Sequence, residues 1–146
     1  MNLPVKKLTE LAKEYQINLM ILFGSYLTEN YNENSDIDLA IQVDDINLIK
    51  TERLKILNQI SALFNYHEID LVLLNYADPL LKFNIACDGK LIYEKKSGLF
   101  NIFKVRAMSE HHDAKKFYQL DKKFIKNYLA KENKHGKSRV SPPQID

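Results

Sequence analysis

The chain contains one cysteine, Cys87, and it has no long apolar run. A lone cysteine excludes an internal disulfide framework and a cysteine-based zinc cluster. No stretch approaches the roughly 20 consecutive apolar residues that a membrane-spanning helix needs. The first residues are amphipathic and lack the apolar core and small-residue cleavage site of a secretory signal. Together these absences predict a cytoplasmic protein.

The two parts of the chain differ in charge. At 146 residues the chain has the size of one typical domain, with a formal net charge of +2. Residues 1–98 hold 10 Lys and Arg against 14 Asp and Glu, whereas residues 99–146 hold 11 against 5. A basic segment can bind nucleic acid or an acidic protein surface. We favour the simpler interpretation, a solvated lysine-rich helix.

Helices and strands alternate up to residue 94. A three- and four-residue apolar spacing predicts helices, and short apolar runs rich in β-formers predict strands. Helices are expected at residues 4–15, 25–28, 46–64 and 79–87, and strands at residues 17–23, 36–43, 68–74 and 90–94. Leu54 is among the apolar positions that we expect the third of these helices to bury. The alternation predicts an α/β fold.

A different pattern begins at Leu99. Aromatic residues recur there at spacings of three, four and seven, which predicts one long amphipathic helix to about Ala130. The expected domain organisation is therefore a globular domain at residues 1–96, a helical arm at 97–130 and a flexible basic tail at 131–146. The positions that form this pattern, two alanines included, are Phe100, Phe103, Ala107, Ala114, Phe117, Phe124 and Tyr128.

Three carboxylates lie on predicted strands. Asp36 and Asp38 are two residues apart, so both side chains leave the same face of one strand. Asp70 occupies a similar apolar strand, and it can approach the other two if these strands pair. Close carboxylates make a hard oxygen site that suits Mg²⁺, and two such ions can bracket the oxygens of a phosphoryl transfer. A third carboxylate can help to deprotonate an attacking hydroxyl.

Gly24 and Ser25 directly follow the first predicted strand. Glycine lets the backbone turn tightly and approach a ligand. A helix that begins at Ser25 would point free amide N–H groups at an anion, and the serine hydroxyl adds a donor. The two residues are therefore a candidate phosphate cradle beside the metal-binding acids.

These residues resemble a known family. Gly24-Ser25, ten further residues and Asp36-Ile37-Asp38 match the signature of the DNA polymerase β-like nucleotidyltransferase superfamily, and Asp70 stands where that family carries its third acid. The chain more narrowly resembles minimal nucleotidyltransferase antitoxins of the MntA type, which are paired with HEPN-domain toxins. The resemblance implies a polymerase β-like core, with a short mixed sheet flanked by helices, plus a long C-terminal helix.

The resemblance also implies an activity. Such antitoxins are similar to protein adenylyltransferases, which move AMP from ATP to tyrosine hydroxyls of the cognate HEPN RNase toxin and so neutralise it. Asp36, Asp38 and Asp70 would be catalytic and would hold two Mg²⁺ ions, while Gly24 and Ser25 would bind the triphosphate. The expected partner is the toxin, in a hetero-oligomer. Many members carry a basic residue shortly after Gly-Ser, but residues 27–30 here contain none.

Other functions are compatible with the same residues. The chain could block a toxin by binding alone, with acids that no longer catalyse. It could instead transfer a nucleotide to a small molecule, although relatives of that kind usually need a second substantial domain for the acceptor. Transfer to RNA is the least favoured alternative, because the aromatic residues of the helical arm are better explained as a packing face.

Overall fold

The chain forms a mixed four-stranded sheet in the order β3-β2-β1-β4. The computed structural model describes residues 3–29, 31–32 and 34–135. The central strand β1 is antiparallel to β2 and β4, and β2 is parallel to β3. The strands are β1 (Ile17–Phe23), β2 (Ile37–Val43), β3 (Ile69–Leu73) and β4 (Lys90–Glu94). All four lie within two residues of their predicted bounds.

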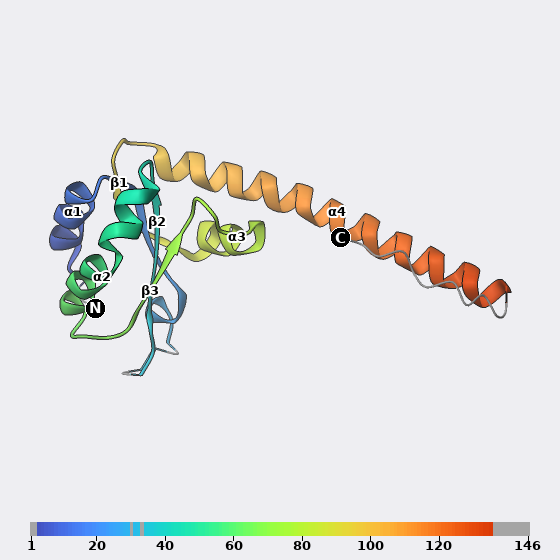
Figure 1. The fold of residues 1–146 in the computed structure, drawn as a ribbon, viewed down its shortest axis with the longest axis horizontal. Coiled ribbons are helices and arrows are strands. Elements are labelled where there is room, and N and C mark those ends of the chain that lie inside the picture. Colours follow the sequence, from blue (N-terminus) through green and yellow to red (C-terminus); the bar gives the residue numbers. More distant parts are fainter. Residues whose placement is uncertain (1–2, 30, 33, 136–146) are drawn as a thin grey trace. The chain divides into compact units, whose positions relative to one another are not determined.

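Helices cover both faces of this sheet. Figure 1 shows α1 and α2 on one side of the strands and α3 on the other. The parallel strands β2 and β3 are joined through α2, as a parallel connection requires. The helices are α1 (Val5–Glu14), the four-residue 3₁₀ helix η1 (Gly24–Leu27), α2 (Ile46–Leu63), α3 (Pro79–Asp88) and α4 (Leu99–His135).

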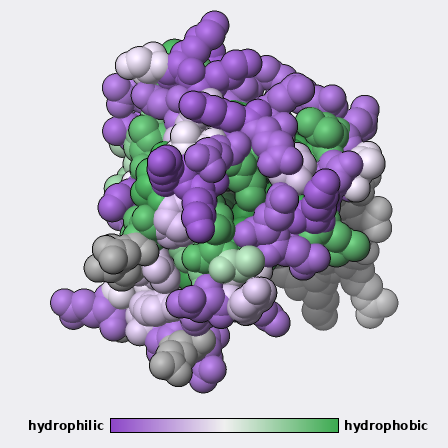
Figure 2. Space-filling model, turned by 90° about the vertical axis from the view of Figure 1, so that its left-hand side faces the viewer, coloured by the Kyte–Doolittle hydropathy of each residue, from purple (hydrophilic) through white to green (hydrophobic). Residues whose placement is uncertain are grey.

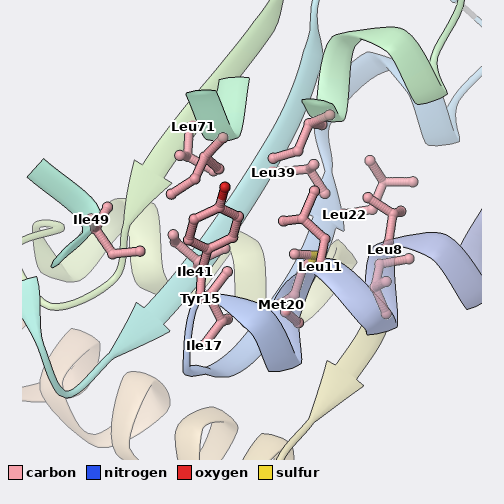
Figure 3. Packing of buried hydrophobic residues seen from close by; sticks show 14 of the residues in the cluster. Leu8, Leu11, Tyr15, Ile17, Met20, Leu22, Leu39, Ile41, Ile49 and Leu71 are labelled. Atoms are coloured by element: carbon pink, nitrogen blue, oxygen red, sulfur yellow. The ribbon is translucent and has the colours of Figure 1, made fainter. Parts of the chain in front are cut away.

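The larger core lies between the sheet and the helices α1 and α2. Leu8 and Leu11 of α1 lie beside Met20 and Leu22 of β1, and Tyr15, which directly follows α1, lies beside Ile41 of β2 (Figure 3). These side chains follow the three- and four-residue spacing of the sequence, so α1 buries one stripe. The outward side of this end of the molecule is mostly hydrophilic, with smaller hydrophobic areas between the polar side chains (Figure 2).

A second, smaller core covers the opposite sheet face. Leu19 and Ile21 of β1 and Ala40 of β2 pack there against Ile85 of α3 and Phe103 of α4. Since side chains alternate along a strand, Asp38 shares this face with Ala40. The carboxylates of the candidate site therefore belong to the α3 side of the sheet.

The predicted starts of α2 and α3 agree with the structure. Asp45 caps α2 by accepting a hydrogen bond from the Leu48 amide at 3.1 Å, and Asp78 caps α3 in the same way from the Leu81 amide at 2.8 Å. Gly89 ends α3 at φ −71°, so it does not need the left-handed region. A Cβ there would lie 2.4 Å from the Ile85 carbonyl oxygen, and close packing therefore requires glycine.

The prediction that Leu54 belongs to the core was wrong. Leu54 is 78% exposed, whereas Ile56 on the same helix is fully buried. α2 buries Ile49, Ile56 and Ile60, which are spaced by seven and four residues. Leu54 lies on the solvent side of that stripe, because the buried side of the helix is fixed by the sheet beneath it and not by apolar character alone.

Other boundaries also differ from the sequence prediction. The helix expected at Ser25 begins at Gly24 and is a 3₁₀ helix, and α4 continues beyond Ala130 to His135. Residues 131–135 of the predicted flexible tail are thus helical, and residues 136–146 lie outside the described residues.

The chain divides into two compact units, Met1–His111 and His112–Asp146. The first unit contains the sheet together with the beginning of α4, where Phe103 and Ala107 are buried. In the second unit, Phe117 and Phe124 are exposed on α4. No helix among the described residues is both long and apolar enough to cross a membrane.

A pair of substitutions on α2 tests this core. Ile56→Ala and Leu54→Ala each remove three carbon atoms from the same helix. We expect Ile56→Ala to lower the free energy of unfolding by about 2–5 kcal/mol, since it leaves a cavity. Leu54→Ala should change that free energy by less than about 0.5 kcal/mol. Urea unfolding followed by circular dichroism measures both values, and equal losses would contradict the assignment of the buried stripe.

Candidate active site

The pairing of β2 with β3 brings two of the predicted acids together. In the parallel register, Asp38 of β2 is the partner of Asp70 of β3. Backbone hydrogen bonds hold both ends of this ladder, from the Ile37 amide to the Glu68 carbonyl at 2.9 Å and from the Leu74 amide to the Ile41 carbonyl at 2.8 Å. The sequence predicted that Asp70 approaches Asp38 only if these two strands pair. The pairing is present, and the two carboxylates leave the same sheet face.

Asp36 lies immediately before β2 and is exposed. A hydrogen-bonded histidine holds the preceding loop. The His67 ring lies 3.3 Å from the Ser35 carbonyl oxygen through Nδ1 and 3.1 Å from the Tyr31 hydroxyl through Nε2. The Ser61 hydroxyl in turn donates to the His67 carbonyl oxygen at 2.8 Å. These contacts tie the backbone next to Asp36 to the end of α2.

The three acids interact electrostatically at Asp38. The pKa of the Asp38 carboxyl is raised from 3.8 to about 6, first by its partial burial and then by the negative charges of Asp70 and Asp36. A hydrogen bond with Asp70 also favours the protonated form of Asp38. A partly desolvated carboxylate beside two others is unfavourable unless a cation compensates its charge.

The backbone of Gly24 approaches the Asp38 carboxylate closely. The residue before it, Phe23, is the register partner of Asp38 on β2, and Gly24 itself adopts φ +81°. A Cβ at this position would lie 2.1 Å from Asp38 Oδ2. Glycine is needed here for its backbone conformation and for this close approach.

Ser25 follows in the 3₁₀ helix η1. Its carbonyl oxygen accepts hydrogen bonds from the Thr28 amide at 2.9 Å and from the Thr28 hydroxyl at 2.8 Å. These bonds close the turn and leave the Ser25 side chain partly exposed. The turn thus stands at the end of β1 beside Asp38, and the phosphate-binding role of Gly24 and Ser25 stays a prediction.

The donor chemistry at the acids suits a hard divalent cation. Carboxylate oxygens are the ligands that Mg²⁺ prefers, and a cation would relieve the repulsion that raises the pKa of Asp38. Among the described residues, no three His, Cys, Asp or Glu side chains are grouped closely enough to hold a metal ion as they stand. The metal-binding role of Asp36, Asp38 and Asp70 therefore stays a prediction.

Sequence reasoning missed the contribution of His67. Together with Tyr66 and Asn65, this residue lines an open cleft of about 420 Å³ that also includes Asp36. Asn65 and Tyr66 have positive φ values of 54° and 62°, which give the chain a sharp turn between α2 and β3. No sequence signal identifies a single histidine after a helix, because its partners Tyr31 and Ser35 are more than 30 residues away.

Solved structures contain the same fold. A toxin–antitoxin crystal structure with AMP-PNP superposes with a TM-score of 0.70 at 24% identity, over 84% of this chain and 98% of that chain. An MNT antitoxin in complex with tri-AMPylated Shewanella oneidensis HEPN toxin superposes with a TM-score of 0.61 at 21% identity, over 83% and 94% of the two chains. These likenesses confirm the predicted core with its mixed sheet and long C-terminal helix.

Sequence comparison places the chain in a family. A protein adenylyltransferase MntA from Aphanizomenon flos-aquae is 33% identical over 133 residues, which cover 83% of this chain and 86% of that protein. The family model described as polymerase beta, nucleotidyltransferase matches residues 6–98, the segment that contains Gly24, Asp38 and Asp70. The chain therefore belongs to the polymerase beta nucleotidyltransferase family.

Proposed function

We propose that this chain is an antitoxin that transfers AMP from ATP to a tyrosine hydroxyl of a cognate HEPN-domain RNase toxin. The observation that carries the proposal is the in-register pair of Asp38 and Asp70 beside Gly24. The relative that is 33% identical is named a protein adenylyltransferase, which indicates a protein hydroxyl as the acceptor.

The acids and the Gly24-Ser25 turn have different roles in the transfer. Asp70 accepts the proton from the tyrosine hydroxyl as its oxygen attacks the α-phosphorus of ATP. A bond forms between that oxygen and the α-phosphorus, and the bond from the α-phosphorus to the bridging oxygen of the β-phosphate breaks, so pyrophosphate leaves. The Gly24 backbone and the Ser25 hydroxyl orient the triphosphate for in-line attack.

Asp36, Asp38 and Asp70 would hold Mg²⁺ in this reaction. The bound ion supplies positive charge that neutralises the phosphate oxygens. Asp38 is the best placed of the three for this role, since it stands between the other two acids and the turn at Gly24. The absence of a basic side chain at residues 27–30 makes the backbone and the carboxylate-bound cation the expected source of compensation for the triphosphate charge.

Label transfer tests the proposed reaction. The chain is incubated with Mg²⁺, the HEPN-domain protein encoded beside it, and ATP labelled on the α- or the γ-phosphate. We expect label on the toxin from α-labelled ATP and none from γ-labelled ATP. The double substitution Asp36→Asn and Asp38→Asn should lower the rate by at least ~100-fold, because it removes the negative charges that would hold the cation against the triphosphate.

A matched double substitution controls for loss of charge. Glu10→Gln with Glu14→Gln also removes two negative charges, from exposed positions of α1 on the other sheet face, and should leave the rate unchanged. If cells that carry the Asp36→Asn and Asp38→Asn variant resist the toxin as well as the wild type does, neutralisation occurs by binding and the proposal is wrong.

The pH dependence of stability tests the repulsion at Asp38. Because the pKa of Asp38 is raised to about 6 in the folded protein, folding is favoured most when this group is protonated. The resulting penalty appears as the pH rises from about 4 through 6 and persists above. Asp38→Asn removes the penalty, so in a chelating buffer its melting temperature should exceed the wild-type value above pH 6 and approach that value near pH 4.

Magnesium provides the second half of this test. Mg²⁺ should raise the melting temperature of the wild type at pH 7.5 more than that of Asp38→Asn, because binding to the folded state stabilises it. Solvent screens the charge of Asp38, which is only partly buried, and therefore reduces the effect of this charge on stability. If the melting temperatures of the wild type and of Asp38→Asn change in parallel between about pH 4 and above pH 6, the raised pKa of Asp38 is ruled out.

Substitution of Gly24 tests the contact with Asp38. Gly24→Ala places a methyl group on the Asp38 carboxylate and should lower label transfer by about 100-fold or more, since small displacements of reacting groups can cost that much. Gly98→Ala is the control: Gly98 also has a positive φ, of 98°, but a Cβ there meets nothing within 4 Å. Both variants should lose stability in thermal melts, by about 1–3 kcal/mol each, and equal loss of transfer would contradict the contact.

A further inference from the structure

A second cleft lies on the sheet face that carries the acids, toward the other end of β2. It has a volume of about 550 Å³ and is formed entirely within the unit Met1–His111. Gln42 of β2, Asn75 after β3 and Phe103 of α4 are among its lining residues. This volume is within the range of specific ligand sites.

Cations from separate elements gather around this cleft. Lys82 comes from α3, Lys95 and Lys96 from the segment after β4, and Arg106 from α4. Lys82 is paired with Glu110 at 3.2 Å. In the part of the chain that the structure describes, no carboxylate lies within 4.0 Å of the charged groups of the other three.

The charge of the cleft is opposite to that of the unit that contains it. Residues 1–111 hold 12 Lys and Arg against 15 Asp and Glu, a net charge of −3. The residues lining the cleft include four cations and two acids, Asp44 and Glu110. Three unpaired cations in an acidic unit attract an anionic ligand to this place in preference to the rest of the surface.

The lining favours an acidic peptide over a phosphodiester chain. Besides the cations, the cleft presents apolar side chains, among them Ile102, Phe103 and Leu74. Ile102 is half exposed on α4. A peptide can place carboxylates on the cations and an apolar side chain between them, whereas the two acids of the lining would repel a continuous row of phosphates.

The cleft is close enough to the candidate active site for one acceptor protein to contact both. Asp38 and Gln42 are four residues apart on β2, so their side chains share a face and lie about 13 Å apart along the strand. The part of the sheet face between them is covered by α3 and the beginning of α4, so a folded acceptor reaches the two regions with separate parts of its surface. A protein held in the cleft can therefore present a hydroxyl to the acids.

We propose that this cleft is a docking site for the acceptor protein, and that it binds an acidic segment containing an apolar residue. The proposal rests on the proposed function for the identity of the acceptor. Docking at a distance from the reacting atoms raises the local concentration of the acceptor hydroxyl and leaves the nucleotide site free for ATP. Lys95, Lys96 and Arg106 provide the attraction, and they are binding residues that do not take part in the chemistry.

The test compares two triple substitutions. Lys95→Gln, Lys96→Gln and Arg106→Gln neutralise the cleft, while Lys6→Gln, Lys7→Gln and Lys13→Gln remove equal charge from exposed positions of α1. The purified HEPN-domain protein is titrated without ATP, and its Kd is measured by calorimetry. We expect the cleft variant to weaken binding by about 10-fold or more, which corresponds to about 1.4 kcal/mol, and the control to bind as the wild type does.

Steady-state kinetics then separate the possible ligands. The cleft variant should raise the KM for the acceptor protein and leave both kcat and the KM for ATP unchanged. Added salt should raise the wild-type KM for the acceptor more than that of the variant, because screening removes the same attraction. An equal rise in the KM for ATP would make the cleft a nucleotide site and would overturn the proposal.

Three further outcomes test the docking site and the proposed function separately. Label transfer with an unchanged Kd and KM in the cleft variant refutes the docking site alone. Absence of label transfer by the wild type refutes the proposed function, and a weakened Kd in that case still supports docking. Binding of a labelled 20-nucleotide single-stranded RNA that is lost in the cleft variant, with the acceptor Kd unchanged, would assign the cleft to RNA instead.

Discussion

The parallel pairing of β2 with β3 is the constraint on which the candidate site depends. It places Asp38 and Asp70 in register, although 32 residues separate them in the chain. The connection passes through α2, whose buried isoleucines hold that helix against the opposite sheet face. A shift of one residue in this pairing would turn the acidic side chain of one strand toward the other face, into the larger core. The register and the core therefore support each other.

The three carboxylates of the candidate site repel one another, and the rest of the fold must be stable enough to hold them together. Asp38 is partly buried between two other acids, and its raised pKa shows how poorly the surroundings compensate its charge. Gly24 brings the backbone against the same carboxylate and leaves it little room to move away. The hydrophobic core holds the acids and Gly24 together, although its side chains take no part in the chemistry. Such a balance is expected where a cation and a phosphorylated ligand bind.

One sheet face carries groups of opposite charge at its two ends. The acids lie at the beginning of β2, and the cleft with Lys95, Lys96 and Arg106 lies beyond its end. The intervening part of this face is covered by α3 and the beginning of α4, which form the smaller core. Helix packing thus keeps the two charged regions apart on one face of the sheet. In our proposals, one region holds the nucleotide and the other holds the acceptor.

Much of the fold follows from local signals in the sequence. The strand bounds, the starts of α2 and α3 and the Gly-Ser turn were predicted because alternation, capping and turn chemistry act over a few residues. The same signals identified Asp36, Asp38 and Asp70 as candidates, and the family is confirmed by comparison. Their roles as metal ligands and catalysts stay predictions. What these signals established is the identity of the elements and of the chemically important side chains.

Only the tertiary structure decided how those elements meet. It placed β3 beside β2, exposed Leu54 while burying Ile56, and joined His67 to Tyr31 and the loop before Asp36. It also gathered the cations of the second cleft from α3, α4 and the segment between β4 and α4. Strand order, the buried side of a helix and clefts between elements arise from contacts between residues far apart in the chain. Local periodicity carries no information about such contacts, so the sequence determined the parts of the site and the packing determined their arrangement.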